Sequence, residues 1–337
     1  MASNGVARLA RRAYEGLPDH VREEIRAKRA EFRGILRIKD NQRLLAMRLA
    51  AVEAQLGLHQ DEHVPVQDPR FPDGVQSRLC TQADLETPWF AQWCTTMELP
   101  PVANRKIWEF AYIAHMFDTL GVLEPGRSAV GFGVGRESLV SAFAARGVRV
   151  LATDLAADEQ EATGWVKSSQ HASDIEGLLR PGICDPEVFR ELVSFRSVDM
   201  RAVPADLAGF DFCWSTCAFE HLGSLEAGLD FVEQSVGTLR PGGYAVHTTE
   251  FNVGSNDETL ETGPTVVYRE RDLLAFRERM EAKGHEVALF DFNRGTKLFD
   301  VFVDVPPFAD EPVLRFDLAG FTLTSVGIVI RAGGATA

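Results

Sequence analysis

The chain has 337 residues, enough for one large domain with an extension or for two domains. With 45% hydrophobic and 25% charged residues, its composition is that of a globular protein. The sequence has no apolar run of about 18 residues and no signal-peptide core, so we expect neither a membrane span nor secretion. Its five cysteines form no C-x-x-C pair, which predicts reduced core thiols in a cytoplasmic chain.

The net charge of −14 is unevenly distributed. Residues 1–56 carry 12 Lys and Arg against 7 Asp and Glu, a net charge of +5. The remainder carries 23 against 42, a net charge of −19. Because so acidic a body repels phosphate groups, we expect a small-molecule substrate and no nucleic acid partner.

A long helix is predicted between Pro18 and about residue 56, because this stretch has no further proline, one glycine and many helix-forming residues. Its apolar residues follow heptad spacing in two rows, with Gln42 as a polar interruption: Ile38, Leu45 and Val52, and beside them Ile35, Leu49 and Leu56. This is the lower limit for a coiled coil. The helix is expected to pack on a second copy of itself, with packing on its own domain as an equal alternative.

Composition divides the chain into three parts. Residues 1–57 form the helical extension, 58–101 a proline-rich linker with an aromatic cap segment, and 102–337 the main domain. Several aromatic side chains are expected either to line a ligand site or to pack in the core: Trp89, Trp93, Trp108, Tyr112, Trp165 and the nearby His171.

From Arg127 onward, short apolar runs alternate with helical patterns, which predicts a parallel sheet with helices on both faces. Strands are expected at 128–132, 148–152, 195–198, 210–215 and 243–248. Helices are expected at 104–120, 137–146, 225–239 and 270–283, with a further helical stretch that follows the second strand and ends at about residue 179. The extended runs at 286–292, 299–305 and 321–331 follow without a helix, so the sheet should end in an antiparallel pair. The predicted fold is α/β, a doubly wound and mostly parallel sheet with a helical N-terminal extension.

A glycine-rich loop, Gly131-Phe132-Gly133-Val134-Gly135, lies between the first strand and the first helix that follows it. Glycines let the backbone approach a ligand, and the helix N-terminus behind them offers free N–H groups. Asp154 follows 19 residues after Gly135, where an acid accepts hydrogen bonds from ribose hydroxyls. Arg136 stands where the dinucleotide fingerprint requires a third glycine, so the spacing disfavours a nicotinamide or flavin enzyme.

The second half of the domain carries further motifs in a set order. The run Phe210-Asp211-Phe212-Cys213-Trp214-Ser215 leads to Glu220-His221, then to Leu239-Arg240-Pro241-Gly242-Gly243 before the fifth strand. The glycine loop, the two strand acids and this last turn together resemble the class I S-adenosylmethionine (SAM)-dependent methyltransferases, over about residues 105–331. The resemblance implies SAM as cofactor and methyl transfer as the reaction.

The matching positions carry implied roles. The loop formed by Gly131, Phe132, Gly133 and Gly135 would pass beneath the methionine part of SAM. Asp154 would bind the ribose, and Leu155 would lie against the adenine. Asp199 and Met200, after the third strand, would meet the amino edge of the adenine.

One position departs from the family pattern. The family has an acid two positions before the first glycine, where it orders the loop and the water near the methionine ammonium. This chain has Ala129 there. Glu137 and Glu109 are the candidates to supply a carboxylate from elsewhere.

The predicted catalytic residues follow the fourth and fifth strands. Ser215 would border the methyl-transfer site, and His221 just beyond it is the predicted base, because histidine takes up a proton near neutral pH. Alternatively, Glu220-His221 caps the following helix. Glu250, which strand alternation places on the side opposite His247, is the competing base or a ligand of the substrate hydroxyl. We predict no metal, because no ligand spacing supports one.

The sequence therefore predicts a SAM-dependent methyltransferase that acts on a hydroxyl of a small acceptor, such as a sugar or a natural product. Two alternatives remain. One is a non-methylating subunit of the same fold that acts through its N-terminal helix, favoured by Ala129. The other is a nucleotide-cofactor oxidoreductase, which the loop spacing opposes.

Overall fold

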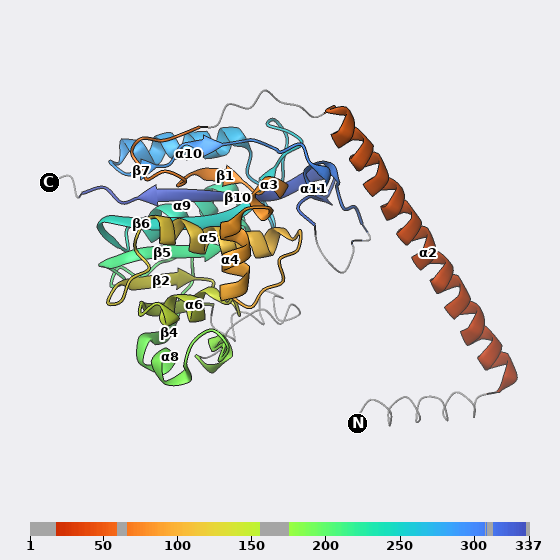
Figure 1. Cartoon of the computed structure of the whole chain (residues 1–337), viewed down its shortest axis with the longest axis horizontal. Coiled ribbons are helices and arrows are strands. Elements are labelled where there is room, and N and C mark those ends of the chain that lie inside the picture. The colour runs from red at the N-terminus through yellow and green to blue at the C-terminus, as the bar shows by residue number, and fades with distance from the viewer. Residues whose placement is uncertain (1–17, 59–65, 156–174, 307, 309–312, 335–337) are drawn as a thin grey trace.

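The computed structural model describes residues 18–58, 66–155, 175–306, 308 and 313–334. Its first described element, α2 (Asp19–Leu56), confirms the predicted long helix. The helix ends at Gly57, whose left-handed φ of 64° lets its N–H bond the carbonyl of Ala54 at 3.2 Å. In Figure 1, α2 runs away from the rest of the chain as a single rod. None of the described helices is long and apolar enough to cross a bilayer.

Ten strands of the described chain form one sheet in the order β4-β3-β2-β5-β6-β10-β1-β8, with β7 and β9 also paired to β10. The strands are β1 (Ser77–Leu79), β2 (Ser128–Phe132), β3 (Arg149–Asp154), β4 (Val193–Ser197), β5 (Phe210–Thr216), β6 (Leu239–Asn252), β7 (Glu286–Val287), β8 (Phe290–Asp291), β9 (Phe316–Leu318) and β10 (Phe321–Arg331). Neighbours from β4 to β6 are parallel, and β10 is antiparallel to β6. The predicted mostly parallel sheet with an antiparallel pair at its end is confirmed.

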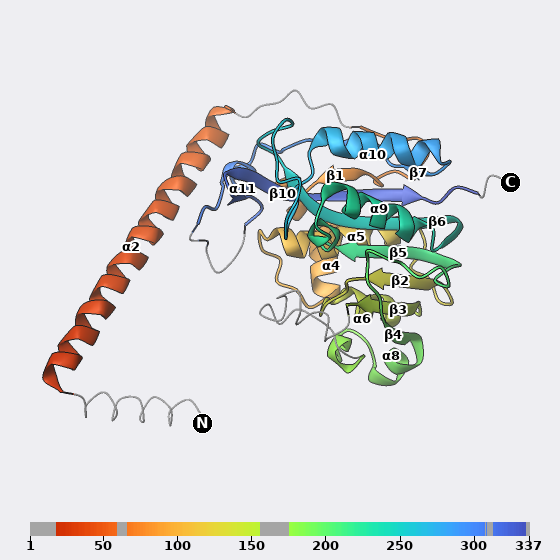
Figure 2. The ribbon, with the colours of Figure 1, turned by 180° about the vertical axis from the view of Figure 1, so that it is seen from behind.

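Helices cover both faces of this sheet, which makes it doubly wound (Figures 1 and 2). They are α3 (Gln82–Leu85), α4 (Pro88–Thr96), α5 (Arg105–Thr119), α6 (Leu139–Ala145), α8 (Pro186–Leu192), α9 (Leu225–Val236), α10 (Glu270–Ala282) and α11 (Leu298–Val301), with 3-10 turns η2 (Glu176–Leu178) and η3 (Phe219–His221). Successive side chains of β5 enter two separate cores: Phe212 and Trp214 pack with α5 and α6, whereas Cys213 packs with α9 and α10.

One predicted extended run is wrong. Residues 299–305 were expected to be a strand, but Leu298–Val301 form α11. A helical turn is favoured here because it directs Leu298, Phe299 and Val301 toward Met47 and Ala50 of α2, with which they form a small separate core.

The segment before the main domain contributes to the sheet. β1 lies in the range expected to be linker and cap, yet it pairs with β10 and β8. The nearby aromatic residues are packed: Trp108 Nε1 donates to Asp84 at 2.8 Å, and the Tyr112 hydroxyl donates to the carbonyl of Gln76 at 2.7 Å. Trp89 stacks on His115 with ring centroids 4.5 Å apart. These residues therefore pack as an extra layer instead of lining the ligand site.

Part of the sequence interpretation falls outside the described residues. The expected helix up to about residue 179 is described only at its end, as η2, and Trp165 and His171 lie in the undescribed part. All five cysteines are described, and each is free and buried, as expected.

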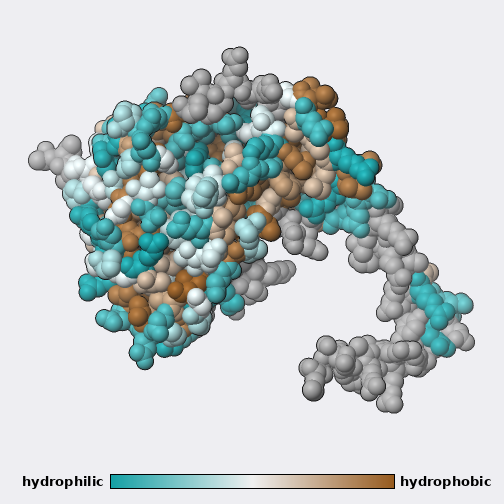
Figure 3. All heavy atoms as spheres, viewed as in Figure 1, coloured by the Kyte–Doolittle hydropathy of each residue, from teal (hydrophilic) through white to brown (hydrophobic). Residues whose placement is uncertain are grey.

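The C-terminal end of α2, from about residue 45, is the root of this helix. It packs on the main domain on one side and leaves a stripe of apolar side chains exposed on the other. Ala50 is buried against Phe302 and Val313. Leu45, Leu49, Val52 and Leu56 are 65%, 59%, 49% and 67% exposed. Figure 3 shows apolar side chains gathered over the end of α2 nearest the body. The side chains of Ile35 and Ile38 are not described.

Candidate functional site

A cavity of about 750 Å³ lies at the carboxyl ends of β2, β3, β5 and β6. Doubly wound sheets bind their ligands at this edge. Its lining includes Leu99, Arg105, Lys106, Phe110, Gly133, Gly135, Arg136, Glu137, Asp154, Leu155, Asp199, Met200, Cys217, Ala218, His221 and Glu250. Eight of the eleven residues that the sequence placed in the site are among them.

The glycine loop after β2 forms one wall of this cavity. Gly133 and Gly135 have φ values of 59° and 50°, in the left-handed region that glycine adopts most readily. A Cβ on Gly133 would lie 3.1 Å from Cβ of Ala218 and 3.2 Å from Sδ of Met200, so a side chain would crowd the opposite wall. The loop therefore brings bare backbone to the cavity surface.

Asp154 ends β3 directly beside this loop. Its carboxylate accepts hydrogen bonds from the backbone N–H groups of Gly135 (3.2 Å) and Leu155 (2.8 Å). The residue is 5% exposed and still lines the cavity. These bonds orient the carboxylate, which is then positioned to accept hydrogen bonds from a ligand.

Asp199 and Met200 follow β4 at the next edge of the cavity. The Arg201 side chain holds the Asp199 carboxylate at 2.8 Å and 3.0 Å. These bonds lower the pKa of Asp199 below its usual value, so it is an anion at neutral pH. Met200 is 8% exposed and offers an apolar surface beside Gly133.

Three predicted cofactor residues do not line the cavity. Gly131 lies against Trp214, whose ring atoms would be 2.5–2.8 Å from a Cβ, so its small size serves packing. Phe132 is fully buried against Phe231 of α9, with ring centroids 5.3 Å apart. The sequence placed both residues beneath the methionine part of SAM, but neither lines the cavity in the structure.

Ser215 also points away from the cavity. Its hydroxyl lies 2.8 Å from Nδ1 of His247, and Nε2 of that histidine lies 3.0 Å from the Ser235 hydroxyl on α9. Burial lowers the pKa of His247 to about 3, so its ring is neutral. The serine was expected to border the methyl-transfer site, but it belongs to a buried polar chain under α9, and Cys217 lines the cavity two residues later.

His221 lines the cavity at the end of η3, as predicted. Its Nδ1 lies 2.9 Å from the carbonyl of Pro264, which holds the proton on that nitrogen and the lone pair on Nε2. The alternative role of helix cap is filled by Ser224, whose hydroxyl accepts the N–H of Ala227 at the start of α9.

Glu220 lies buried behind His221. One of its oxygens is 3.9 Å from Nε2 of His221, and the other accepts the hydroxyl of Thr249 at 3.2 Å. Burial raises the pKa of Glu220 above its usual value. Across the described residues, no group of three His, Cys, Asp or Glu side chains is arranged to hold a metal.

Glu250 lies on the facing wall in a buried network of charges. Its Oε1 accepts from Nη2 of Arg105 at 2.7 Å, whereas Oε2 is buried without a hydrogen-bond partner in the described chain. Arg105 also donates to Glu109 at 3.2 Å, and Lys106 lies 3.1 Å from the same carboxylate. Burial raises the pKa of Glu109, but the charges of Lys106 and Arg105 outweigh it and lower the pKa overall.

Arg105 and Lys106 are site residues that the sequence analysis missed. They occupy the first turn of α5, directly after the cap Asn104. Cations at a helix N-terminus are unfavourable because they face the positive end of the helix dipole. Two consecutive basic residues in the first turn of a helix therefore indicate a tertiary or functional role, and this was the signal in the sequence that could have identified them.

The chain was compared with known proteins. No protein-family model and no curated protein matches it. Among solved structures it is similar to the magnesium protoporphyrin IX methyltransferase from Synechocystis PCC 6803, solved with bound SAH, at 10% identity and a TM-score of 0.39 over 73% of this chain and 96% of that one.

Two further solved structures are similar at the same level. The CcbJ methyltransferase from Streptomyces caelestis has 13% identity and a TM-score of 0.37, over 70% of this chain and 98% of that one. An O-methyltransferase family protein from Burkholderia thailandensis has 11% identity and a TM-score of 0.35, over 69% and 60%. Because these sequence identities and TM-scores are low, the conclusion about the fold rests on the strand order and the glycine loop of this chain.

The antiparallel β10 pairs with β6 on one side and with the short strands β1 and β7 on the other. An antiparallel pair was predicted from the extended runs that follow one another without a helix. The chain has the fold of a class I SAM-dependent methyltransferase.

The methyltransferase fold here lacks the usual acid at Ala129, and Glu137 lies nearest to replacing it within the cavity. Its carboxyl accepts the indole N–H of Trp214 at 2.5 Å. Burial raises the pKa of Glu137 to about 8. Glu109 instead lies behind the cavity wall, bound to Arg105 and Lys106.

Replacing Glu137 by Gln should remove part of the pH dependence of stability. A carboxyl whose folded pKa is raised contributes its full stability below its unfolded pKa, near 4.5, and loses it as pH rises through about 8. Relative to the parent, Glu137→Gln should therefore gain up to about 1.4 kcal/mol per pH unit over this range. Urea unfolding at pH 5 and pH 8.5 measures it, with the exposed Glu258→Gln as control. An equal difference at both pH values would contradict it.

Proposed function

We propose that this chain is a SAM-dependent methyltransferase that methylates a hydroxyl group of a small acceptor, such as a sugar or a natural product. The observation that carries the proposal is that one cavity, of about 750 Å³, holds both sets of residues. It joins the bare glycine loop and Asp154 on one side to His221 and Glu250 on the other. One half fits an adenosine-containing cofactor, and the other fits a polar acceptor.

The residues of the first half fit SAM. When bound, SAM supplies an electrophilic methyl group on a sulfonium. The Asp154 carboxylate accepts hydrogen bonds from ribose hydroxyls, and Leu155 and Met200 offer apolar surface to the adenine. The left-handed glycines allow the close approach of the methionine part. An ionised Glu137 would then attract the ammonium.

The residues of the second half can take up a proton. The bond of Nδ1 to Pro264 leaves the lone pair of His221 on Nε2, which accepts the hydroxyl proton as the acceptor oxygen attacks. The carboxyl group of Glu220 lies 3.9 Å from Nε2. His221 is therefore the general base in this proposal.

Glu250 has a different role. Arg105 binds its Oε1 at 2.7 Å, so this oxygen is already engaged within the protein. Its Oε2, buried and without a hydrogen-bond partner in the described chain, is suited to accept a hydrogen bond from the acceptor. Glu250 thus orients the acceptor hydroxyl toward His221.

A second candidate is a non-methylating subunit of the same fold that acts through α2. The exposed stripe of Leu45, Leu49, Val52 and Leu56 favours it, as does the missing acid at Ala129. Release of S-adenosylhomocysteine during incubation with SAM and a panel of hydroxylated acceptors distinguishes the two, because only an enzyme produces it.

Changing Asp154 to Asn should weaken SAM binding. Losing a charged acceptor costs about 1.5–3 kcal/mol, or roughly tenfold to over a hundredfold in affinity. Calorimetric titration with SAM measures this, with NAD as a ligand expected not to bind and Asp257→Asn in an exposed loop as the matched control. If Asp154→Asn binds SAM as tightly as the parent, the cofactor does not lie against β3.

Changing His221 to Ala should lower kcat by about 10²–10⁴-fold and leave SAM affinity nearly unchanged, because a general base contributes that much in rate. Turnover with an identified acceptor and SAM titration measure the two effects. Retained turnover in His221→Ala with a dead Glu250→Gln would make Glu250 the base.

We also propose that α2 mediates self-association, because its apolar stripe faces away from the body. Leu45→Lys combined with Leu49→Lys should lower the oligomeric state of the full chain in sedimentation velocity. Ala46→Lys with Gln55→Lys adds the same charge at exposed positions outside the stripe and should leave it unchanged. The proposal fails if both double variants sediment like the parent.

A further inference from the structure

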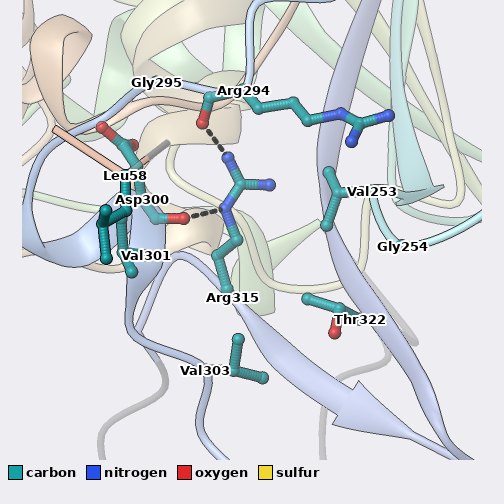
Figure 4. A pocket seen from close by; sticks show the side chains of 10 residues that line it. All are labelled: Leu58, Val253, Gly254, Arg294, Gly295, Asp300, Val301, Val303, Arg315 and Thr322. Atoms are coloured by element: carbon teal, nitrogen blue, oxygen red, sulfur yellow. Dashed lines mark hydrogen bonds between the residues drawn. The ribbon is translucent and has the colours of Figure 1, made fainter. Parts of the chain in front are cut away.

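A second cavity, of about 380 Å³, lies at the root of α2, away from the methyltransferase site. Figure 4 shows the ten residues that line it: Leu58, Val253, Gly254, Arg294, Gly295, Asp300, Val301, Val303, Arg315 and Thr322. They come from the end of α2, the loop after β6, α11 with the loop before it, the segment before β9 and the start of β10. Two of the lining side chains are guanidinium groups.

Arg315 is the central group of this cavity. It is 2% exposed, and its Nε donates to the carbonyl of Asp300 at 2.7 Å, while Nη2 donates to the carbonyl of Arg294. Its remaining nitrogen, Nη1, is buried without a hydrogen-bond partner in the described part of the chain. In Figure 4, Nη1 points away from these two carbonyls toward the side where Val253 and the Arg294 guanidinium lie.

The charge of Arg315 is poorly compensated by the protein. Within the described ranges, no carboxylate lies within ion-pair distance of it. Asp300, the nearest acid in the lining, uses its carboxylate oxygens to accept the N–H groups of Gln82 (2.7 Å) and Lys297 (3.0 Å). Burial raises the pKa of Asp300. A guanidinium does not lose its proton, so the positive charge remains.

A purely structural role explains only part of this arrangement. The two carbonyl bonds tie the loop at Arg294 and Asp300 to the segment before β9. They leave one buried donor group and one buried charge unsatisfied, and buried charges in proteins are normally paired. The exposed guanidinium of Arg294 adds a second positive charge to the same cavity.

We propose that this cavity binds a small oxyanion, a carboxylate or phosphate group, between Nη1 of Arg315 and the Arg294 guanidinium. Guanidinium groups bind such oxygens with short, charge-assisted hydrogen bonds. The cavity volume lies within the range of small-molecule sites. The ligand supplies a counter-charge that no described residue places at ion-pair distance from Arg315.

The test uses the full chain at constant ionic strength, with sodium phosphate or sodium acetate replacing sodium chloride. Thermal unfolding and calorimetry measure a saturable rise in Tm and a binding heat, and the stronger of the two anions identifies the group that is bound. Arg294→Gln removes an exposed charge whose side chain supports no part of the fold. Arg149→Gln removes an exposed charge on β3 as the matched control.

Arg294→Gln should weaken binding by about tenfold, the effect of one charged hydrogen bond, and Arg149→Gln should leave it unchanged. Arg315→Lys keeps the positive charge but removes the paired N–H donors of the guanidinium. If this variant folds, its affinity for the anion should fall by at least as much as that of Arg294→Gln. The proposal is overturned if neither anion gives a saturable effect on the parent. It is equally overturned if Arg294→Gln and Arg149→Gln bind the anion like the parent.

Discussion

The buried guanidinium of Arg105 is the interaction on which the main site depends. It bonds Glu109 on its own helix and Glu250 on β6, so it fixes the first turn of α5 against the carboxyl end of the sheet. The helix dipole opposes a cation at this position, and the tertiary contacts must outweigh that cost. Removing one member of such a set typically costs 3–5 kcal/mol, because it leaves a buried charge uncompensated. The same hydrogen bonds of Arg105 therefore form the polar wall of the cavity and hold α5 against the sheet.

The sequence predicted the parts of the site that follow from topology. Gly133, Asp154, His221 and Glu250 lie up to about a hundred residues apart, yet they meet because the carboxyl ends of parallel strands share one edge. Strand alternation also grouped residues correctly, since His247 faces α9 whereas Glu250 on the same strand faces α5. Local sequence patterns, together with the rule that parallel strands end at one edge of the sheet, were sufficient to predict these positions.

Features that depend on distant partners could not be predicted. Alternation states which side chains share a side of a strand but not which side meets a ligand, so Phe132 and Ser215 were placed in the site although both face α9. The three residues of β1 become a strand only through pairing with β8 and β10, more than 200 residues later. Residues 298–301 form a helical turn whose apolar side chains pack on α2, a partner distant in the sequence.

The smaller cavity is linked to the larger one through two neighbouring residues, although no lining residue is common to both. Arg315 faces the smaller cavity, and the next residue, Phe316, packs on Arg105 with its ring centroid 4.5 Å from the guanidinium carbon. Because neighbouring residues of an extended segment point to opposite sides, Arg315 lines the smaller cavity while Phe316 contacts Arg105, a lining residue of the larger one. A shift of this segment would change the contact with Arg105. Because Arg105 bonds Glu250, the shift would also reach the cavity wall that carries Glu250. The root of α2 adjoins the same smaller cavity through Leu58, so the N-terminal helix and the wall that carries Glu250 are joined through a continuous set of contacts.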